Sequence, residues 1–245
     1  MEICRFGVGG RQRACEAALS EIEAARYERL VLLPIPTTRD GEHISSTDTP
    51  LREILSLVGR GTLVAGYNIP DALGAEILSS GGEVYDAALD EDFLIENAEI
   101  TAEGALGKIL CDFKKAPRDL KVGIVGYGRI SKALTRLLLF LGASVKIYTR
   151  RDAVRLSLAE YGIESSHGES VGDFSGLDIL FNTAPARFPA EVAESLSGNT
   201  VLFDLASGRC FDDGVEFIKL SSVPDAMYPD TAGKIYARYI SGHLT

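Results

Sequence analysis

The chain has 245 residues, 46% of them hydrophobic, with 25 Lys and Arg against 35 Asp and Glu. These values predict a globular protein of one or two domains, and the net charge of −10 argues against nucleic acid and acidic membrane surfaces as partners. No apolar run approaches the ~20 residues that span a bilayer, and the N-terminus lacks a basic and apolar signal segment. The four cysteines and three histidines lack metal-ligand spacing. We therefore expect no metal site, reduced thiols and a cytoplasmic location.

Apolar runs alternate with helical patterns through the first part of the chain, which predicts a parallel α/β layer. A long helical pattern follows and ends at Pro117. A second series of apolar runs then predicts most of another parallel sheet. The expected strands are 2–7, 30–33, 62–65, 83–85, 122–125, 143–148, 179–181, 201–203 and 217–220, and the expected helices are 11–24, 51–58, 71–78, 95–115, 133–141 and 231–241.

This order of elements predicts two doubly wound parallel-sheet α/β domains. Residues 1–95 would form a shortened, flavodoxin-like domain that binds substrate or a partner, completed by a return helix at 231–245. Residues 96–117 would form a linking helix, and residues 118–230 a Rossmann dinucleotide-binding domain. We expect the pair of domains to form a homo-oligomer, in the simplest case a dimer.

A glycine turn lies between a strand and a helix at Gly126-Tyr127-Gly128-Arg129-Ile130-Ser131. The first glycine permits a tight turn, and the second lets a pyrophosphate approach the amide groups of the helix N-terminus. The motif alone is unspecific. Because it lies inside a complete βαβ pattern, we favour dinucleotide binding over a plain structural turn.

The residues after the second strand of this unit predict the cofactor. NAD sites usually place Asp or Glu there, about 20 residues after the first glycine. This chain has Thr149-Arg150-Arg151, whose hydroxyl and guanidinium groups suit a 2′-phosphate. NADP is therefore favoured over NAD, although the two arginines are also typical of a solvated helix start.

Two further loops follow expected strands, at the sheet edge where parallel α/β proteins bind ligands. Small side chains in both loops would let a dinucleotide lie against the backbone, while Asn182 or Asp204 would orient the nicotinamide or a substrate. Equally, both side chains are typical caps of the next turn. The loops are Asn182-Thr183-Ala184-Pro185 and Asp204-Leu205-Ala206-Ser207.

A set of short strings is spread along the chain, each unspecific by itself: Gly9-Gly10 with Arg11-Gln12, Leu33-Pro34 with Thr37-Thr38, Asn97 with Thr101, Glu103 and Gly104, the Gly126 turn, Asn182-Thr183 with Pro185, Asp204 to Ser207, and Pro224 with Thr231-Ala232-Gly233. In order and spacing this set resembles the family of the A subunit of dipicolinate synthase, the dehydrogenase-like subunit that makes dipicolinic acid during sporulation of spore-forming bacteria.

The resemblance implies oxidation of a hydroxylated tetrahydrodipicolinate, or of its dehydrated form, to dipicolinate with hydride transfer to NADP⁺. It also implies a flavoprotein-like partner, the second subunit. The candidate catalytic residues are Glu103, which would take a ring proton, Asn97, which would orient the reacting groups, and Thr101, which would donate to a substrate carboxylate. Candidate substrate-binding residues are Thr37, Thr38, Arg39, Ser207 and Thr231. Loop capping by the threonines, a solvated Arg39 and helix-dipole pairing of Glu103 are the ordinary alternatives.

Three departures from the family pattern leave the substrate more open than the cofactor. A strand and helix are missing between Ala25 and Arg29, Ser221 to Asp225 replace a glycine-richer loop, and the residues after Ser207 differ. A D-2-hydroxy-acid dehydrogenase is a second hypothesis, but His167 and His243 are poorly placed to serve as its proton donor. A non-catalytic NADP-binding subunit is a third.

Overall fold

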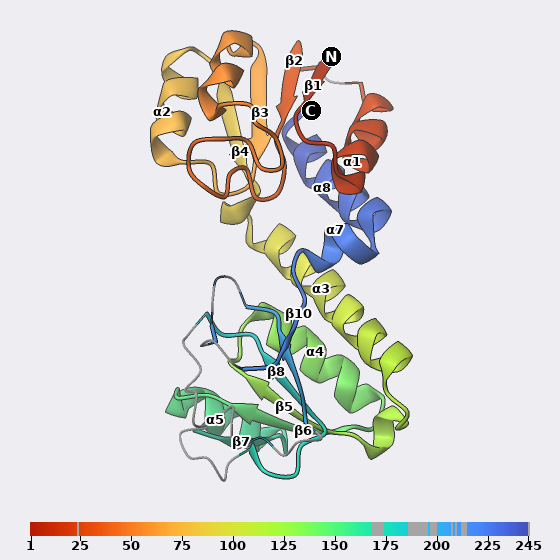
Figure 1. Ribbon diagram of the computed structural model, residues 1–245. Coiled ribbons are helices and arrows are strands. Elements are labelled where there is room, and N and C mark those ends of the chain that lie inside the picture. Colours follow the sequence, from red (N-terminus) through yellow and green to blue (C-terminus); the bar gives the residue numbers. More distant parts are fainter. Residues whose placement is uncertain are drawn as a thin grey trace. The chain divides into compact units, whose positions relative to one another are not determined.

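The computed structural model describes residues 1–23, 25–167, 174–185, 196, 200–206, 208, 210–211 and 215–244 (Figure 1). The chain divides into two compact units. Unit 1 comprises Met1–Asn97 and Pro224–Thr245, and unit 2 comprises Ala98–Val223. Unit 1 is thus built from two separate stretches of sequence, whereas unit 2 is continuous.

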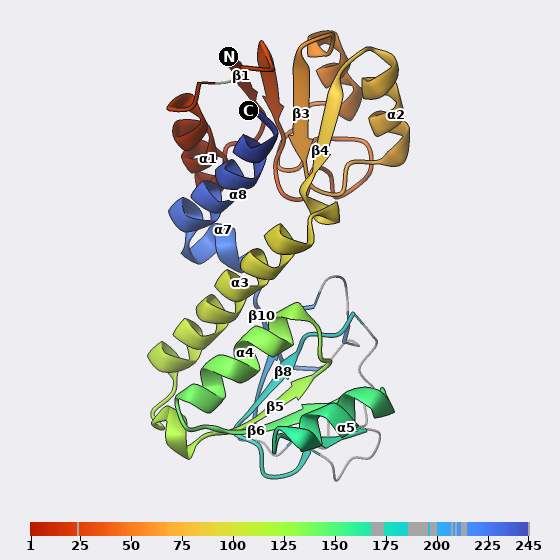
Figure 2. The same cartoon turned by 180° about the vertical axis from the view of Figure 1, so that it is seen from behind.

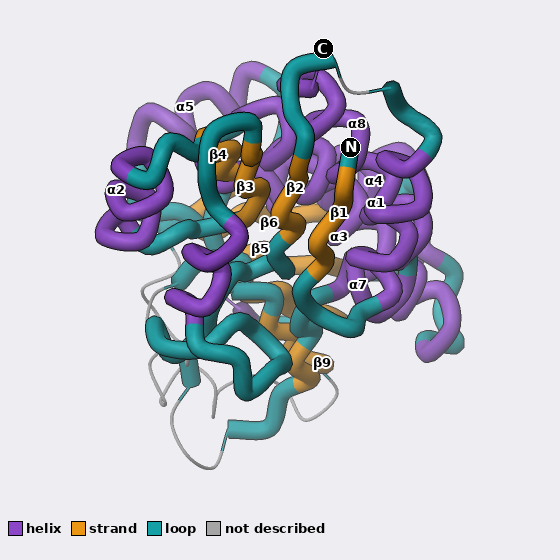
Figure 3. Tube along the Cα trace, turned by 90° about the horizontal axis from the view of Figure 1, so that it is seen from above, coloured by secondary structure: helices purple, strands orange, loops and turns teal. Residues whose placement is uncertain are grey.

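Unit 1 is a four-stranded parallel sheet with helices on both faces. The strands lie in the order β1 (Glu2–Arg5), β2 (Arg29–Leu32), β3 (Thr62–Gly66) and β4 (Glu83–Asp86). Apolar residues on one face of the sheet pack against α1 (Gly10–Ser20) and α8 (Pro229–Leu244). The opposite face packs against the 3₁₀ helix η1 (Leu51–Leu57) and α2 (Asp71–Ser79), as Figure 3 shows from above.

The connection from β1 to β2 runs on the opposite face from the connection between β3 and β4. Both connections step in the same direction along the strand order, yet α1 and α2 cover different faces. Parallel crossovers that step the same way on opposite faces have opposite hands, whereas nearly all such crossovers are right-handed. In the flavodoxin order 2-1-3-4-5, the helix after the first strand leads outward to an edge strand. The arrangement of unit 1 corresponds to that order without the edge strand.

Helices α1 and α8 approach so closely that only glycine fits at their crossing. A Cβ atom on Gly233 of α8 would lie 2.5 Å from the backbone oxygen of Arg11 and 2.6 Å from Cβ of Ala14. Both distances are shorter than a van der Waals contact, so any side chain at Gly233 would push the helices apart. Cys15 and Leu19 on α1 and Tyr236 and Ile240 on α8 are fully buried in the core that this close packing creates.

Unit 2 is a six-stranded parallel sheet with the Rossmann strand order. The strands are β5 (Lys121–Val125), β6 (Ser144–Tyr148), β7 (Glu164–Ser166), β8 (Ile179–Asn182), β9 (Val201–Asp204) and β10 (Ile218–Lys219). Their spatial order is β10-β9-β8-β5-β6-β7, which is the doubly wound order 6-5-4-1-2-3. The direction of winding reverses between β5 and β8, where such folds bind their ligands.

Within the described residues, three helices cover one face of the unit 2 sheet, as the reverse view in Figure 2 shows. They are α4 (Arg129–Phe140), α5 (Asp152–Glu160), which connects β6 to β7, and the part of α3 (Glu91–Asp112) that belongs to unit 2. The remaining short elements are η2 (Ala87–Leu89), η3 (Pro117–Asp119) and α7 (Val223–Met227).

The predicted fold class of two doubly wound domains with a linking helix and a return helix is confirmed. Several predicted elements differ in detail. Residues 51–57 form a 3₁₀ helix rather than the predicted α-helix over 51–58. The long helix α3 starts four residues earlier than predicted, and β10 is only two residues long. We did not predict α5, β7 or α7, which are short, and β7 is a partly exposed edge strand with the polar sequence Glu-Ser-Ser.

Within the described residues no helix is long and apolar enough to cross a membrane.

Candidate functional site

The glycine turn of unit 2 joins β5 to the N-terminus of α4. Gly126 follows β5 with φ +92°, a conformation that L side chains rarely adopt. Gly128 is the N-cap of α4 and places no side chain over the helix N-terminus, and a Cβ atom added to it would meet no atom within 4 Å. Among the described residues no side chain makes a cap hydrogen bond to the amide end of α4, and uncapped helix N-termini are typical binding sites for anions. Ser131 donates its hydroxyl to the backbone oxygen of Gly126 at 2.9 Å and closes the turn.

The loop after β8 lies against this turn. A Cβ atom on Gly126 would lie 2.9 Å from Oγ1 of Thr183 and 3.2 Å from Cβ of Ala184. Thr183 donates both its backbone N–H and its hydroxyl to the backbone oxygen of Val125. The structure therefore brings the first glycine and the Asn182 to Pro185 loop together, at the carboxyl ends of β5 and β8 where the winding reverses.

Arg150 and Arg151 lie after β6 but differ in their contacts. Arg151 donates to the backbone oxygen of Tyr127 at 3.1 Å, which ties the β6 loop to the glycine turn. Arg150 is exposed and makes no hydrogen bond or ion pair with the part of the chain that the structure describes. Thr149 is buried, and its backbone oxygen accepts from Arg155 at 3.1 Å. Arg150 is thus the guanidinium in this loop that is available to a phosphate.

Asn182 and Asp204 form a buried network with a lysine that the sequence did not single out. Each is 1% exposed, and Nδ2 of Asn182 donates to Oδ1 of Asp204 at 2.9 Å. Lys219 of β10 donates from Nζ to Oδ2 of Asp204 at 2.7 Å and to the backbone oxygen of Ala206 at 2.6 Å. The carboxylate also accepts from the backbone N–H of Ala206. These side chains hold the loops after β8 and β9, as the capping alternative describes. The available sequence signal was the single charged residue in the otherwise apolar run 217–220.

In unit 1, the predicted substrate residues Thr37, Thr38 and Arg39 lie in the loop after β2. Thr37 is fully buried, and its hydroxyl accepts the backbone N–H of Tyr67 at 2.9 Å. It fastens this loop to the loop after β3, so its hydroxyl does not face solvent. Thr38 accepts the backbone N–H of Gly41, and Arg39 is exposed.

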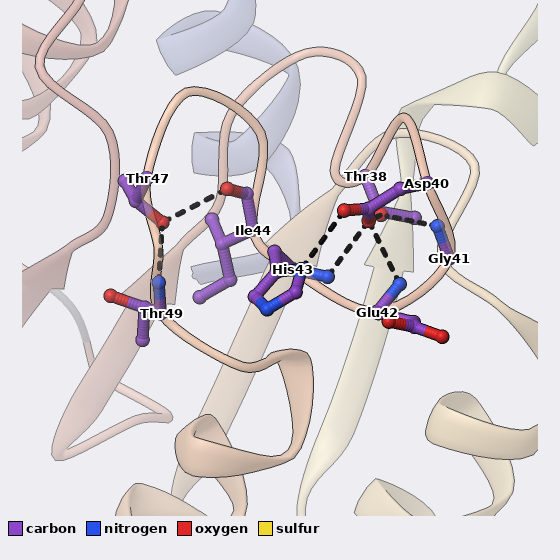
Figure 4. A network of polar contacts seen from close by, with 8 residues as sticks. All are labelled: Thr38, Asp40, Gly41, Glu42, His43, Ile44, Thr47 and Thr49. Carbon is purple, nitrogen blue, oxygen red and sulfur yellow. Dashed lines mark hydrogen bonds and ion pairs between the residues drawn. The ribbon is translucent and has the colours of Figure 1, made fainter.

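The same loop contains an Asp–His pair that sequence reasoning missed (Figure 4). Oδ1 of Asp40 accepts the backbone N–H groups of Glu42 and His43 and the hydroxyl of Thr38, while Oδ2 lies 2.9 Å from Nδ1 of His43. The backbone donors, first that of His43, hold the pKa of Asp40 below its usual value. The hydrogen bond to Asp40 raises the pKa of His43. The spacing Asp-x-x-His was the only sequence signal.

The three predicted catalytic residues on α3 are not equivalent. Thr101 is buried, whereas Glu103, two positions later, is exposed. Residues two apart in a helix do not face each other, so the structure does not bring Thr101 and Glu103 together. Asn97 accepts a hydrogen bond from the guanidinium of Arg11.

Two predicted substrate residues remain. Thr231 is exposed in the first turn of α8. Ser207 lies outside the described residues. No group of three or more potential metal ligands occurs among the residues that the structure describes.

Comparison with solved structures defines the class of fold. D-lactate dehydrogenase from Escherichia coli matches over 99% of this chain and 96% of its own, with a TM-score of 0.60 and 11% identity. A transhydrogenase from Sinorhizobium meliloti matches over 88% of this chain and 73% of its own, with a TM-score of 0.61 and 16% identity. The chain thus has the two-domain fold of the Rossmann-type dehydrogenases.

A particular member of this class is more similar. The A subunit of dipicolinate synthase from Bacillus halodurans matches all of this chain and 97% of its own, with a TM-score of 0.82 and 20% identity. The corresponding protein from Bacillus subtilis is 28% identical over 160 residues, which are 62% of this chain and 54% of that protein. The aligned stretch thus spans about half the length of that relative. No protein-family model matches the chain. The predicted resemblance is confirmed: the chain is similar in sequence and in fold to the A subunit of dipicolinate synthase.

Proposed function

We propose that this protein is an NADP-dependent oxidoreductase that converts a hydroxylated tetrahydrodipicolinate, through its dihydro form, to dipicolinate. The observation that carries the proposal is the open N-terminus of α4 behind Gly126, at the reversal point of a Rossmann sheet. The similarity to the A subunit of dipicolinate synthase supports the choice of substrate.

The residues of unit 2 fit a dinucleotide. The amide end of α4 would bind the pyrophosphate, and Gly128 leaves the backbone accessible there. Arg150 would pair with a 2′-phosphate, and Arg151 holds its loop to the glycine turn. The Asn182–Asp204–Lys219 network would keep the loops after β8 and β9 in place against the nicotinamide half. In this proposal Asn182 and Asp204 position the site, and the small residues Thr183, Ala184 and Pro185 line it.

The substrate carries two carboxylates and a ring that becomes aromatic. Loss of water from the hydroxylated ring gives the dihydro form, and removal of a hydride and a proton then gives dipicolinate. When bound, NADP⁺ supplies the hydride acceptor. Because aromatisation favours this step, orientation of the ring supplies much of the rate. Thr38, Arg39, Thr231 and Ser207 would bind the carboxylates, and Glu103 would accept the ring proton. Thr37 would act by holding the loop that carries Thr38.

The proposed partners are a second copy of this chain and a flavoprotein-like second subunit. The experiment that tests the reaction mixes the purified protein with NADP⁺ and enzymatically generated hydroxytetrahydrodipicolinate, with and without the second subunit. Dipicolinate is then followed by mass spectrometry against a mixture without enzyme. We expect enzyme-dependent dipicolinate together with one NADPH per product.

The control reactions replace NADP⁺ by NAD⁺ and the substrate by D-lactate. The D-lactate arm is included because the fold also matches D-lactate dehydrogenase. Tight NADPH binding without product in any mixture would contradict the proposed reaction and would favour a non-catalytic NADP-binding subunit. Oxidation of D-lactate would favour the 2-hydroxy-acid alternative.

A further inference from the structure

The chain passes between the two units twice, and both passages adjoin the same buried side chain. It leaves unit 1 after Asn97 and re-enters it at Pro224. Arg11, near the N-terminus of α1, contacts Asn97 beside the first passage and Asp225 beside the second. These residues are far apart in sequence, so their meeting at one guanidinium is a property of the fold alone.

The guanidinium of Arg11 is enclosed by the segments that carry the chain out of unit 1 and back into it. The side chain is 1% exposed. It donates to Oδ1 of Asn97 on α3, to Oδ2 of Asp225 on α7 at 3.4 Å and to the backbone oxygen of Ala232 on α8 at 3.4 Å. Its Cζ atom lies 6.0 Å from the ring centre of Phe93, also on α3. One side chain of α1 thus joins α3, α7 and α8 within unit 1.

Burial of a charge at this position is costly. Burial lowers the pKa of Arg11, and it raises the pKa of Asp225 even though Arg11 and Arg39 act in the opposite direction. Both 3.4 Å contacts are long for charge-assisted hydrogen bonds. Apolar residues would fill this space at lower cost, as Cys15 and Leu19 do further along α1. A buried ionic group of this kind is therefore expected to specify an arrangement rather than to add stability.

The backbone just outside this cluster is in an unusual conformation. Ser222, two residues before Pro224, has φ +49°. A residue other than glycine in the left-handed region is uncommon, and such conformations persist only where the surrounding structure holds them. The second passage thus has a strained residue on one side and the Arg11–Asp225 contact on the other.

We propose that Arg11 is a positioning residue that acts as a clamp: it fixes the chain to α1 both where it leaves unit 1, at Asn97, and where it re-enters unit 1, at Asp225. The clamp requires a forked donor, because one group must reach α3, α7 and α8 together. It goes beyond the proposed reaction and does not depend on it.

Hydrogen exchange followed by mass spectrometry on the cofactor-free, full-length protein tests the clamp. In Arg11→Met we expect exchange about tenfold faster in peptides that cover 93–100 and 223–229, because a hydrogen bond to a charged group is lost. Peptides that cover 29–32 and 62–66 in the sheet should exchange as in the unchanged protein. Arg5→Met is the matched control: it removes an ion pair of unit 1, with Glu16, that contacts neither passage.

Two further variants keep the test decisive if Arg11→Met does not fold. Arg11→Lys retains the charge without the fork, so we expect it to protect only one of the two passages. Asp225→Asn should speed exchange around 223–229 and leave 93–100 unchanged. Exchange equal to that of the unchanged protein, or faster to the same extent throughout unit 1, would overturn the clamp and leave Arg11 an ordinary core residue.

Discussion

Arg150 is the residue on which the proposed preference for NADP depends. Arg150 is exposed in the loop after β6. NAD sites usually have a carboxylate at the end of this strand, where this chain has Thr149-Arg150-Arg151. We predict that Arg150→Ala weakens NADPH binding about tenfold or more, since a charge-assisted phosphate contact contributes roughly 1.5–3 kcal/mol. NADH binding should change little. Titration calorimetry with both nucleotides checks this, and equal small effects would exclude the 2′-phosphate assignment.

The pair of Asp40 and His43 predicts a pH window for the loop after β2. The pKa of His43 is raised from 6.5, so its contribution is fully present below that pH and is lost as the pH rises through the folded-state pKa. The pKa of Asp40 is lowered from 3.8, so its contribution is present above that pH and is lost as the pH falls through its folded-state pKa. The loop should be most ordered between these values.

Titration of the His43 ring by nuclear magnetic resonance measures this coupling. Asp40→Asn should return the His43 pKa towards 6.5. Glu42→Gln is the control, because Glu42 acts on His43 only through its charge and less strongly than Asp40. A shift of the same size in both variants would show that the hydrogen bond is not the cause.

At the scale of elements, the crossing of α1 and α8 is the packing that only glycine permits. Gly233→Ala should destabilise unit 1 by about 1–3 kcal/mol, the usual cost of overpacking. Gly242→Ala, on the same helix but with no atom within 4 Å of the added Cβ, is the control. It should stabilise the protein by about 0.5–1 kcal/mol through helix propensity. Urea denaturation of both variants gives the two values, and similar free energies of unfolding would refute the packing argument.

Elements with a regular spacing of apolar residues were predicted correctly, and elements without one were missed. The alternation of apolar runs placed β5, β6 and α4 correctly, since their residues are buried at regular spacing. Short polar edge elements gave no such pattern, which is why β7 was missed. The 3₁₀ geometry of η1 was missed because Leu51, Ile54, Leu55 and Val58 have the spacing that an α-helix also gives.

At the scale of the whole molecule, unit 2 is one continuous segment, whereas unit 1 needs α8 from the end of the chain. Tyr236, Ile240 and Leu244 of α8 are completely buried in unit 1. A chain that ends at Val223 should therefore lose the cooperative unfolding of unit 1 and retain NADPH affinity to within about twofold, because unit 2 keeps its own core.

Thermal unfolding by circular dichroism, together with NADPH titration, checks the truncated chain against the full-length protein. Cooperative unfolding of unit 1 without α8 would contradict the assignment of α8 to its core. Loss of NADPH binding would show that unit 2 does not form its site alone.

Local spacing was enough to predict the fold class, the glycine turn and the family resemblance, because apolar periodicity, glycines at a turn and residues that follow a strand are all visible in the order of the residues. Which polar residues meet depends on the packing of the folded chain. Buried Thr37 holds the loop after β2 to the loop after β3, and Asp204 forms an ion pair with Lys219. Arg11 donates hydrogen bonds to Asn97 and Asp225. Burial and long-range pairing depend on how distant segments pack, and sequence spacing carries no measure of that.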